Sequence, residues 1–272
     1  MSRLIQPARQ RLSRSAAPWR WAWLGAGLGL VAAVLVWAPA RWLIWGVTQA
    51  SQDRVLLESA RGSVWRGSAQ LVLSGGQGSR NAQALPGRIH WQIEPGWLSS
   101  RLRLQADCCM SSPVQLLMHV GLSNVDLQFE AHRSQWPAAL LSGLGAPWNT
   151  LQPEGHLQLR TESLGLQWAV GRLQMKGLVE LQAQDMSTRL STLKPMGSYL
   201  VQLRGTPQGS PTPELILSTI RGPLQLSGQG QWVGARLRFT GEASADEGSE
   251  SALSNLLNII GRRQGASSLL SF

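Results

Sequence analysis

The chain has 272 residues, a formal net charge of +10 and only two cysteines. Its basic residues are unevenly distributed: residues 1–41 hold six arginines and no acidic residue, and the rest holds 19 basic residues against all 15 acidic ones. A nucleic-acid-binding domain needs a basic surface on its folded part, so this distribution argues against that class of function.

Residues 21–40 form an uninterrupted run of 20 uncharged residues. A helix of this length spans about 30 Å, which matches the hydrocarbon core of a bilayer, and the run lacks the polar stripe of a helix on a soluble core. Tryptophans, which favour both membrane interfaces, flank it: Trp21 and Trp23 lie at one end, and Trp37, Trp42 and Trp45 lie at the other. We therefore predict a transmembrane anchor over residues 21–45.

A cleaved signal peptide is the alternative for the same segment. Ala38, Pro39 and Ala40 fit the small-x-small pattern that precedes a cleavage site, here after Ala40. The apolar character resumes after Arg41 as "WLIW", and the run is of full bilayer length. Both features favour an anchor that stays attached to the chain.

Two glycines within the anchor, Gly25 and Gly29, are four residues apart. Small residues at this spacing let two membrane helices approach closely. Glycine is also common in membrane helices in general, so the spacing fits either a helix–helix contact or the ordinary composition of a membrane helix.

The arginines before the anchor predict its orientation. Arg20 and the arginines upstream of it precede the apolar run, and the first acidic residue is Asp53. Positive charge is held on the cytoplasmic side of a membrane. We expect a cytoplasmic basic tail over residues 1–20 and an external domain over residues 46–272.

The external region alternates apolar and polar residues with a period of two. Clear examples are "RIHWQIE" (88–94), "NVDLQFEAH" (124–132), "GPLQLSGQGQW" (222–232) and "ARLRFTGEA" (235–243). Such alternation predicts strands with one face on a core and one in water. Turn signals between the runs indicate a mainly β fold, an antiparallel sheet that is curled or forms a groove.

Two segments break this pattern and predict short helices. One lies near residues 135–145, and it could divide the β domain near residue 150. The other covers residues 250–261, where Leu253, Leu256 and Leu257 share one helical face. That apolar face needs a partner, and the sheet of the same chain is the first candidate.

The cysteines and histidines do not form a metal-binding pattern. Cys108 and Cys109 are adjacent and could pair with each other, pair between molecules or stay as buried thiols. Two adjacent cysteines without a second pair are a poor zinc site. The histidines are isolated and are expected on strand surfaces: His90, His119, His132 and His156. No metal and no cofactor are predicted.

No catalytic motif is present in the sequence. It lacks a Gly-x-Ser-x-Gly elbow, a phosphate loop and a His-Glu-x-x-His helix, and its carboxylates are scattered singly. Lys194 precedes Pro195 in a turn-like loop, where a solvated lysine is the simplest reading. We expect a structural or binding protein rather than an enzyme.

Several stretches, taken in order, resemble one family. These are "RGSVWRGSAQL" (61–71), "LSTLKPMGSYLVQLRG" (190–205), "GPLQLSGQGQW" (222–232), "LRFTGEA" (237–243) and "LSNLLNIIGRRQGASS" (253–268). Together with the N-terminal anchor, they are similar to the type II secretion system protein N family, also called general secretion pathway protein N. Residues 74–150 carry no motif of that family.

The resemblance implies an inner-membrane accessory component of the machine that exports folded proteins across the outer membrane, with most of the chain in the periplasm. The implied partners are the platform proteins or the secretin, and no catalytic residue is carried over. Two segments are candidate contact sites, although each could simply build a turn and fill a core: Gly62, Trp65 and Gly67 in the first, and Lys194, Pro195, Gly197 and Tyr199 in the second. A periplasmic β-groove that binds or transports lipid is the alternative function.

Overall fold

The computed structural model describes residues 19–121, 123–169, 172–205, 213–233 and 236–271. The chain divides into two compact units, Met1–Ala38 and Pro39–Phe272. In unit 1 the structure describes helix α1 (Trp19–Val36), and most of the predicted basic tail lies outside the described residues. Among the described helices, none is both long enough and apolar enough to cross a membrane.

The continuous helix expected over residues 21–45 is instead two helices. The first, α1, ends at Val36, and α2 (Ala40–Ser51) begins after Pro39, whose backbone is extended with φ −72° and ψ 149°. Proline has no amide hydrogen to continue a helical ladder, and it favours the start of a new helix. The apolar side of α2 then packs on the sheet of unit 2, where Ala40 and Leu43 join a cluster around Leu57.

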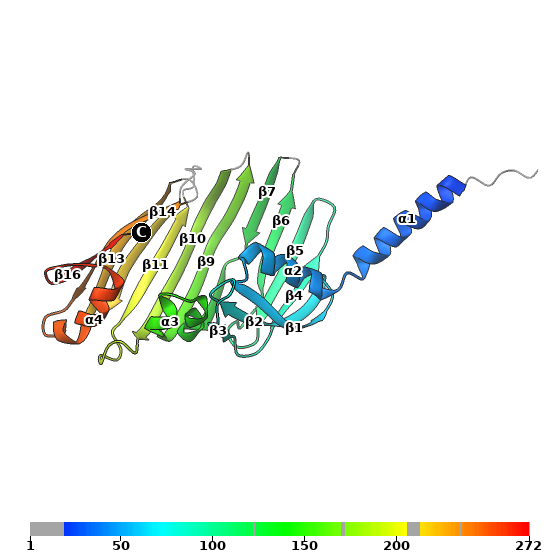
Figure 1. The fold of residues 1–272 in the computed structure, drawn as a ribbon. Helices are drawn as coiled ribbons and strands as arrows, with labels where there is room; N and C mark the ends of the chain where they lie inside the picture. The colour runs from blue at the N-terminus through cyan, green and yellow to red at the C-terminus, as the bar shows by residue number, and fades with distance from the viewer. Residues whose placement is uncertain (1–18, 122, 170–171, 206–212, 234–235, 272) are drawn as a thin grey trace, which may run out of the picture. The chain divides into compact units, whose positions relative to one another are not determined.

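Unit 2 is built on one antiparallel sheet, which contains sixteen strands in the part that the structure describes. The strands are β1 (Val55–Gly62), β2 (Arg66–Ser74), β3 (Ala82–Ala84), β4 (Ile89–Glu94), β5 (Ser99–Ala106), β6 (Val114–Val120), β7 (Asn124–Phe129), β8 (His132–Pro137), β9 (Glu154–Ala169), β10 (Arg172–Ser187), β11 (Gly197–Gly205), β12 (Glu214–Arg221), β13 (Leu224–Val233), β14 (Arg236–Ala245), β15 (Arg262–Gln264) and β16 (Ser267–Ser271). Each strand pairs mostly with its neighbour in the chain (Figure 1). The predicted mainly β, antiparallel fold is confirmed.

The period of two gives this sheet an apolar face and a polar face. Leu181 of β10 is paired with Leu159 of β9 and with Val201 of β11 on one face. The next residue, Glu180, is paired with Arg160 and Gln202 on the other. Side chains of directly paired residues lie on the same side of a sheet, so the apolar face continues from strand to strand.

Helices bury the apolar face in two places. Around the first strands, α2 and the 3₁₀ helix η1 (Ala138–Leu144) pack onto a cluster that contains Trp91 and Leu140. Around the last strands, α4 (Glu250–Ile260) packs Leu253 and Leu257 onto a second cluster. Met175 of β10, between the two clusters, is buried, but several other apolar side chains there are only half-buried: Leu116, Met118, Leu127, Val201 and Leu203. Unit 2 therefore has two cores, which are joined by the strands that lie between them in the sheet.

The predicted helix at residues 250–261 is confirmed by α4. The one expected near residues 135–145 is only partly right, because His132–Pro137 is strand β8 and the helix begins after Pro137. Near residue 150 the chain forms the short helix α3 (Trp148–Leu151), and the sheet continues from β8 into β9.

Antiparallel pairing sorts the strand connections into two ends of the sheet. At the hairpin end lie the last residues of β1, β4, β6, β9, β11 and β13 and the first residues of the strands that follow each of them, β2, β5, β7, β10, β12 and β14. At the helical end lie η1, α3, α4 and the connections β5–β6, β10–β11 and β12–β13. Figure 1 shows α3 and α4 at the lower ends of the strands, with the tips of β6, β7 and β9 above. Of the two predicted contact segments, the β1–β2 hairpin lies at the hairpin end and the β10–β11 connection lies at the helical end.

Candidate interaction surfaces

The β1–β2 hairpin, one of the two predicted contact segments, is built around a buried tryptophan. The indole Nε1 of Trp91 donates to the carbonyl oxygens of Ser63 and Val64, at 3.2 and 3.1 Å. Gly62 turns the chain with φ +93°, a conformation that glycine adopts without strain. Gly67 leaves room for the Trp91 ring, so both predicted glycines have a packing role.

Trp65 sits at the tip of the same hairpin. Its side chain is half-buried, and its carbonyl oxygen accepts a hydrogen bond from the Ile93 amide at 2.6 Å. The tip is thereby tied to β4. The other two predicted residues of this hairpin are glycines, so Trp65 is the one whose side chain a partner could contact at the hairpin end.

The second predicted segment connects β10 to β11 at the helical end. Lys194 Nζ lies 3.0 Å from Glu154 Oε2, and both side chains are about half exposed, at 51% and 50%. The Lys194–Pro195 peptide bond is cis. Gly197 and Tyr199 are buried, so Lys194 and Pro195 are the predicted residues that a partner could reach.

Tyr199 packs in the second cluster, and burial raises the pKa of its phenol well above its usual range. Its hydroxyl has no hydrogen-bond partner in the described part of the chain. Nearby, Ser191 donates its hydroxyl to the carbonyl oxygen of Ala252 in α4, at 3.2 Å. The segment ties α4 to the sheet. The structure does not bring it together with the β1–β2 hairpin.

The predicted anchor residues are divided between the two units. Trp21, Trp23, Gly25 and Gly29 are in α1, and Trp37 follows it. Trp42 and Trp45 are in α2, where their side chains are 47% and 69% exposed. A methyl group added to either α1 glycine would meet nothing within 4 Å, so close helix approach there remains a prediction.

Cys108 and Cys109 form a disulfide with each other in the connection between β5 and β6. The carbonyl oxygen of Cys109 accepts a hydrogen bond from the Gln135 amide at 2.8 Å, which holds this connection against β8. A small cavity of about 400 Å³ lies beside it, lined by Arg133 and Gln158 among others.

The histidines lie apart from one another. His90 Nε2 is 3.1 Å from Asp107 Oδ1, and the Arg88 amide, which donates to Asp107, is the main cause that lowers the pKa of that carboxyl. Burial lowers the pKa of His132, whose Nε2 has no partner in the described region. Within the described ranges, no group of three histidine, cysteine or acidic side chains could hold a metal ion.

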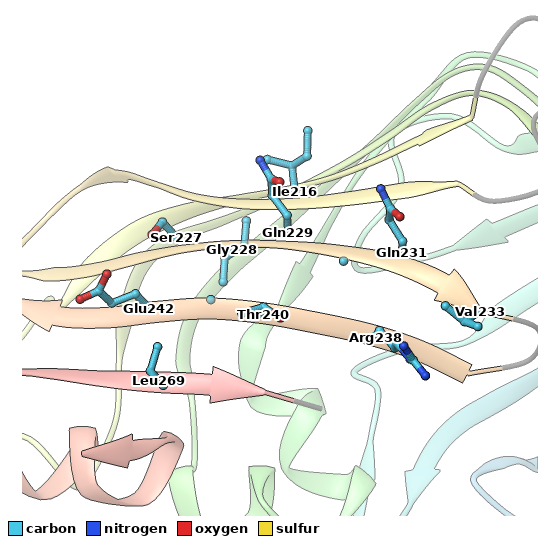
Figure 2. Close-up of a pocket in the computed structure, with 13 residues that line it drawn as sticks. Ile216, Ser227, Gly228, Gln229, Gln231, Val233, Arg238, Thr240, Glu242 and Leu269 are labelled. Carbon is cyan, nitrogen blue, oxygen red and sulfur yellow. The ribbon is translucent and has the colours of Figure 1, made fainter. Parts of the chain in front are cut away.

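The polar face carries a shallow cavity of about 830 Å³ over β12, β13, β14 and β16. Figure 2 shows Gln231 of β13 opposite Arg238 of β14, with Gln229 further along β13 and Glu242 at the other end of the cavity beside Ser227. These side chains offer donors, acceptors and both signs of charge, which suits recognition of a polar surface or an extended backbone. Sequence reasoning missed this cavity, although the alternation of glutamine with glycine in "SGQGQW" was its visible signal.

Comparison with known proteins identifies the family. The model of the type II secretion system (T2SS) protein N family matches residues 53–269, which covers the strands of unit 2 from β1 into β16. A search of curated proteins and one of solved structures gave no match. Because the family model covers most of the chain, this chain belongs to the type II secretion system protein N family.

Proposed function

We propose that this chain is an accessory component of the type II secretion machine that is anchored in the inner membrane and acts through protein contacts in the periplasm. The observation that carries the proposal is the family match over residues 53–269, because it takes in nearly all of the sheet. Members of this family are secretion components, and no enzymatic activity is assigned to them. The role therefore rests on where the sheet is held and what it contacts.

The N-terminal segment supports the membrane part of the proposal. Arginines precede α1, and α1 has apolar residues on all sides, as Leu24, Leu30 and Val36 show. A helix of a soluble domain would carry a polar stripe. Arginine on the cytoplasmic side would leave unit 2 in the periplasm. A periplasmic reporter and a cytoplasmic reporter, each fused to the C-terminus, test this orientation; activity of the cytoplasmic reporter alone would contradict it.

The polar face supports the contact part of the proposal. Gln229, Gln231, Arg238 and Glu242 are exposed around the 830 Å³ cavity. A platform protein or the secretin could place a polar strand or loop there and be recognised by hydrogen bonds and charge. Lys194 and Pro195 offer a second, smaller contact at the helical end.

Photo-crosslinking in cells that contain the whole machine tests these contacts. A photoreactive residue replaces Gln231, Lys194 or Trp65 in turn, and Asn255 on the exposed side of α4 serves as the control position. We expect covalent adducts with a platform protein or the secretin from Gln231 or Lys194 and none from Asn255. Capture of lipid alone, or of nothing, from all three test positions in secreting cells would overturn the contact proposal.

Lipid handling is the second candidate, because of the apolar face between the two cores. Leu127, Val201 and Leu203 belong to neither cluster and are only half-buried. An acyl chain could cover them. Native mass spectrometry of the full chain in mild detergent should then detect stoichiometric phospholipid that is lost in Leu127→Glu. Protein free of phospholipid would favour protein contacts instead.

A further inference from the structure

Exposed apolar side chains gather at the hairpin end of the sheet. Trp97, in the β4–β5 turn, is 99% exposed, and its neighbour Leu98 is 69% exposed. Val120 at the end of β6 is 53% exposed, and Trp168 near the end of β9 is 54% exposed. We refer to Trp97, Leu98, Val120 and Trp168 as the tryptophan row. Covering large exposed apolar side chains with another surface lowers the free energy.

The tryptophan row is continuous across the sheet. The Val120 amide donates to the carbonyl oxygen of Leu98 at 3.3 Å. Val120 is paired with Val125 of β7, and Val125 is paired with Trp168 of β9. Paired residues share a face, so Val120, Val125 and Trp168 lie on the apolar face at the hairpin end. One flat surface could therefore meet the whole row.

The chain enters unit 2 at this same end. Pro39, the first residue of unit 2, forms an isolated β-bridge with Ser63 in the β1–β2 connection. Only two residues, Trp37 and Ala38, lie between the end of α1 at Val36 and Pro39, a reach of about 10 Å at most. If α1 lies in a membrane, the first hairpin must lie close to that membrane.

The charges at the hairpin end fit a membrane surface. The exposed charged side chains that the structure describes within four positions of the hairpin-end connections are all basic: Arg61, Arg66, Arg101, Arg204, Arg236 and Arg238. The acidic residues there, Glu94, Asp126 and Glu214, are half-buried. Anionic lipid headgroups attract exposed arginines, and tryptophan favours the headgroup region of a bilayer.

We propose that the tryptophan row contacts the headgroup region of the membrane in which the chain is anchored. The inference rests on the proposed anchoring of unit 1. The occupant of this surface is the lipid bilayer, because the entry point of the chain, the exposed tryptophans and the basic side chains all lie at one end. The contact would hold the helical end away from the bilayer, where other components can reach it.

A fluorescent label at the row tests the contact in the full-length protein. Trp97→Cys is labelled with a dye sensitive to polarity, without reductant, and reconstituted into vesicles of phosphatidylethanolamine and phosphatidylglycerol. The wild-type chain, whose cysteines are paired, controls for labelling elsewhere. Ala266→Cys, exposed at the opposite end of the sheet, is the matched control.

We expect the emission of the label at position 97 to shift to shorter wavelength and to be quenched by a lipid with a nitroxide near its headgroup. The label at position 266 should show neither effect. If the protein floats with the vesicles but the label at 97 stays in water, the contact is refuted while the anchor stands. If the protein does not float, the anchor itself fails. If the label at 97 responds only when other secretion components are added, the row binds protein and the lipid contact is refuted.

Discussion

Trp91 of β4 is paired with Gly67 of β2, and its ring occupies the space that a side chain at residue 67 would need. A β-carbon there would overlap the indole and lie 2.7 Å from the carbonyl oxygen of Arg61. The ring also holds the Ser63 and Val64 carbonyls. The glycine, the tryptophan and the hairpin therefore form one packing unit in the first core.

Gly67→Ala should destabilise the protein by about 1–3 kcal/mol, because the added methyl group overpacks the Trp91 ring. Gly46→Ala, in helix α2 with nothing within 4 Å of the new β-carbon, is the control and should be neutral or slightly stabilising. Urea unfolding in detergent, followed by tryptophan fluorescence, measures both. Equal stability of the two variants would show that the ring moves aside freely.

In the second core, an aromatic ring is again packed on glycines; the ring is that of Phe239. Gly228, Gly230 and Gly241 surround its ring, and a β-carbon at Gly241 would lie 3.0 Å from Phe239 Cε1. Gly228→Ala should therefore be destabilising, and Phe239→Leu should relieve part of the clash. A double-mutant cycle on the free energy of unfolding should give a coupling above about 0.5 kcal/mol. Strictly additive changes in the free energy of unfolding would mean that Gly228 is not required to make room for the Phe239 ring.

Helix α4 should stabilise the second core through one side only. Leu257 is fully buried, whereas Ile259 two residues later is 51% exposed. Leu257→Ala should cost about 2–5 kcal/mol of unfolding free energy because it leaves a cavity. Ile259→Ala should change it by less than about 0.5 kcal/mol. A large effect at Ile259 would instead indicate that a partner or a second copy covers that side.

His132 should make stability depend on pH. Burial lowers the pKa of its imidazole in the folded protein, so the unfolded chain binds a proton more readily as the pH falls below about 6.5. The free energy of unfolding should therefore be complete above that pH and decrease on acidification. His132→Gln should flatten this dependence, and His156→Gln, at an exposed position, serves as the control. An unchanged slope in His132→Gln would rule out this assignment.

Much of the fold follows from local patterns. The alternation of Ile89, Trp91 and Ile93 predicts β4, and the spacing of Leu253, Leu256 and Leu257 predicts α4, because burial on one side acts within a few residues. The break at Pro39 was not predicted. Ala38, Pro39 and Ala40 also fit a cleavage site, and the helix that begins at Ala40 packs in a cluster with Trp91 and Leu140, which are distant in sequence.

The candidate sites were harder to predict for a physical reason. A motif marks residues that the fold requires as well as residues that a partner touches. Gly62, Gly67 and Gly197 stood out in the sequence, and the structure gives each of them a tight backbone position. Trp97 follows a Pro-Gly turn signal, but only the structure reveals that its side chain is 99% exposed and that its neighbour Leu98 is hydrogen-bonded to Val120.

Because the hairpins follow one another along the sheet, the number of strands sets the distance between the two ends of the hydrogen-bonded path. Fourteen of the described strands follow one another in a single hydrogen-bonded path from β1 to β15, and neighbouring strands are spaced about 4.8 Å apart, so the path measures about 60 Å. Each two-stranded step pairs only with those beside it. Inserting or deleting one step would lengthen or shorten the span by about 10 Å while leaving both terminal cores intact.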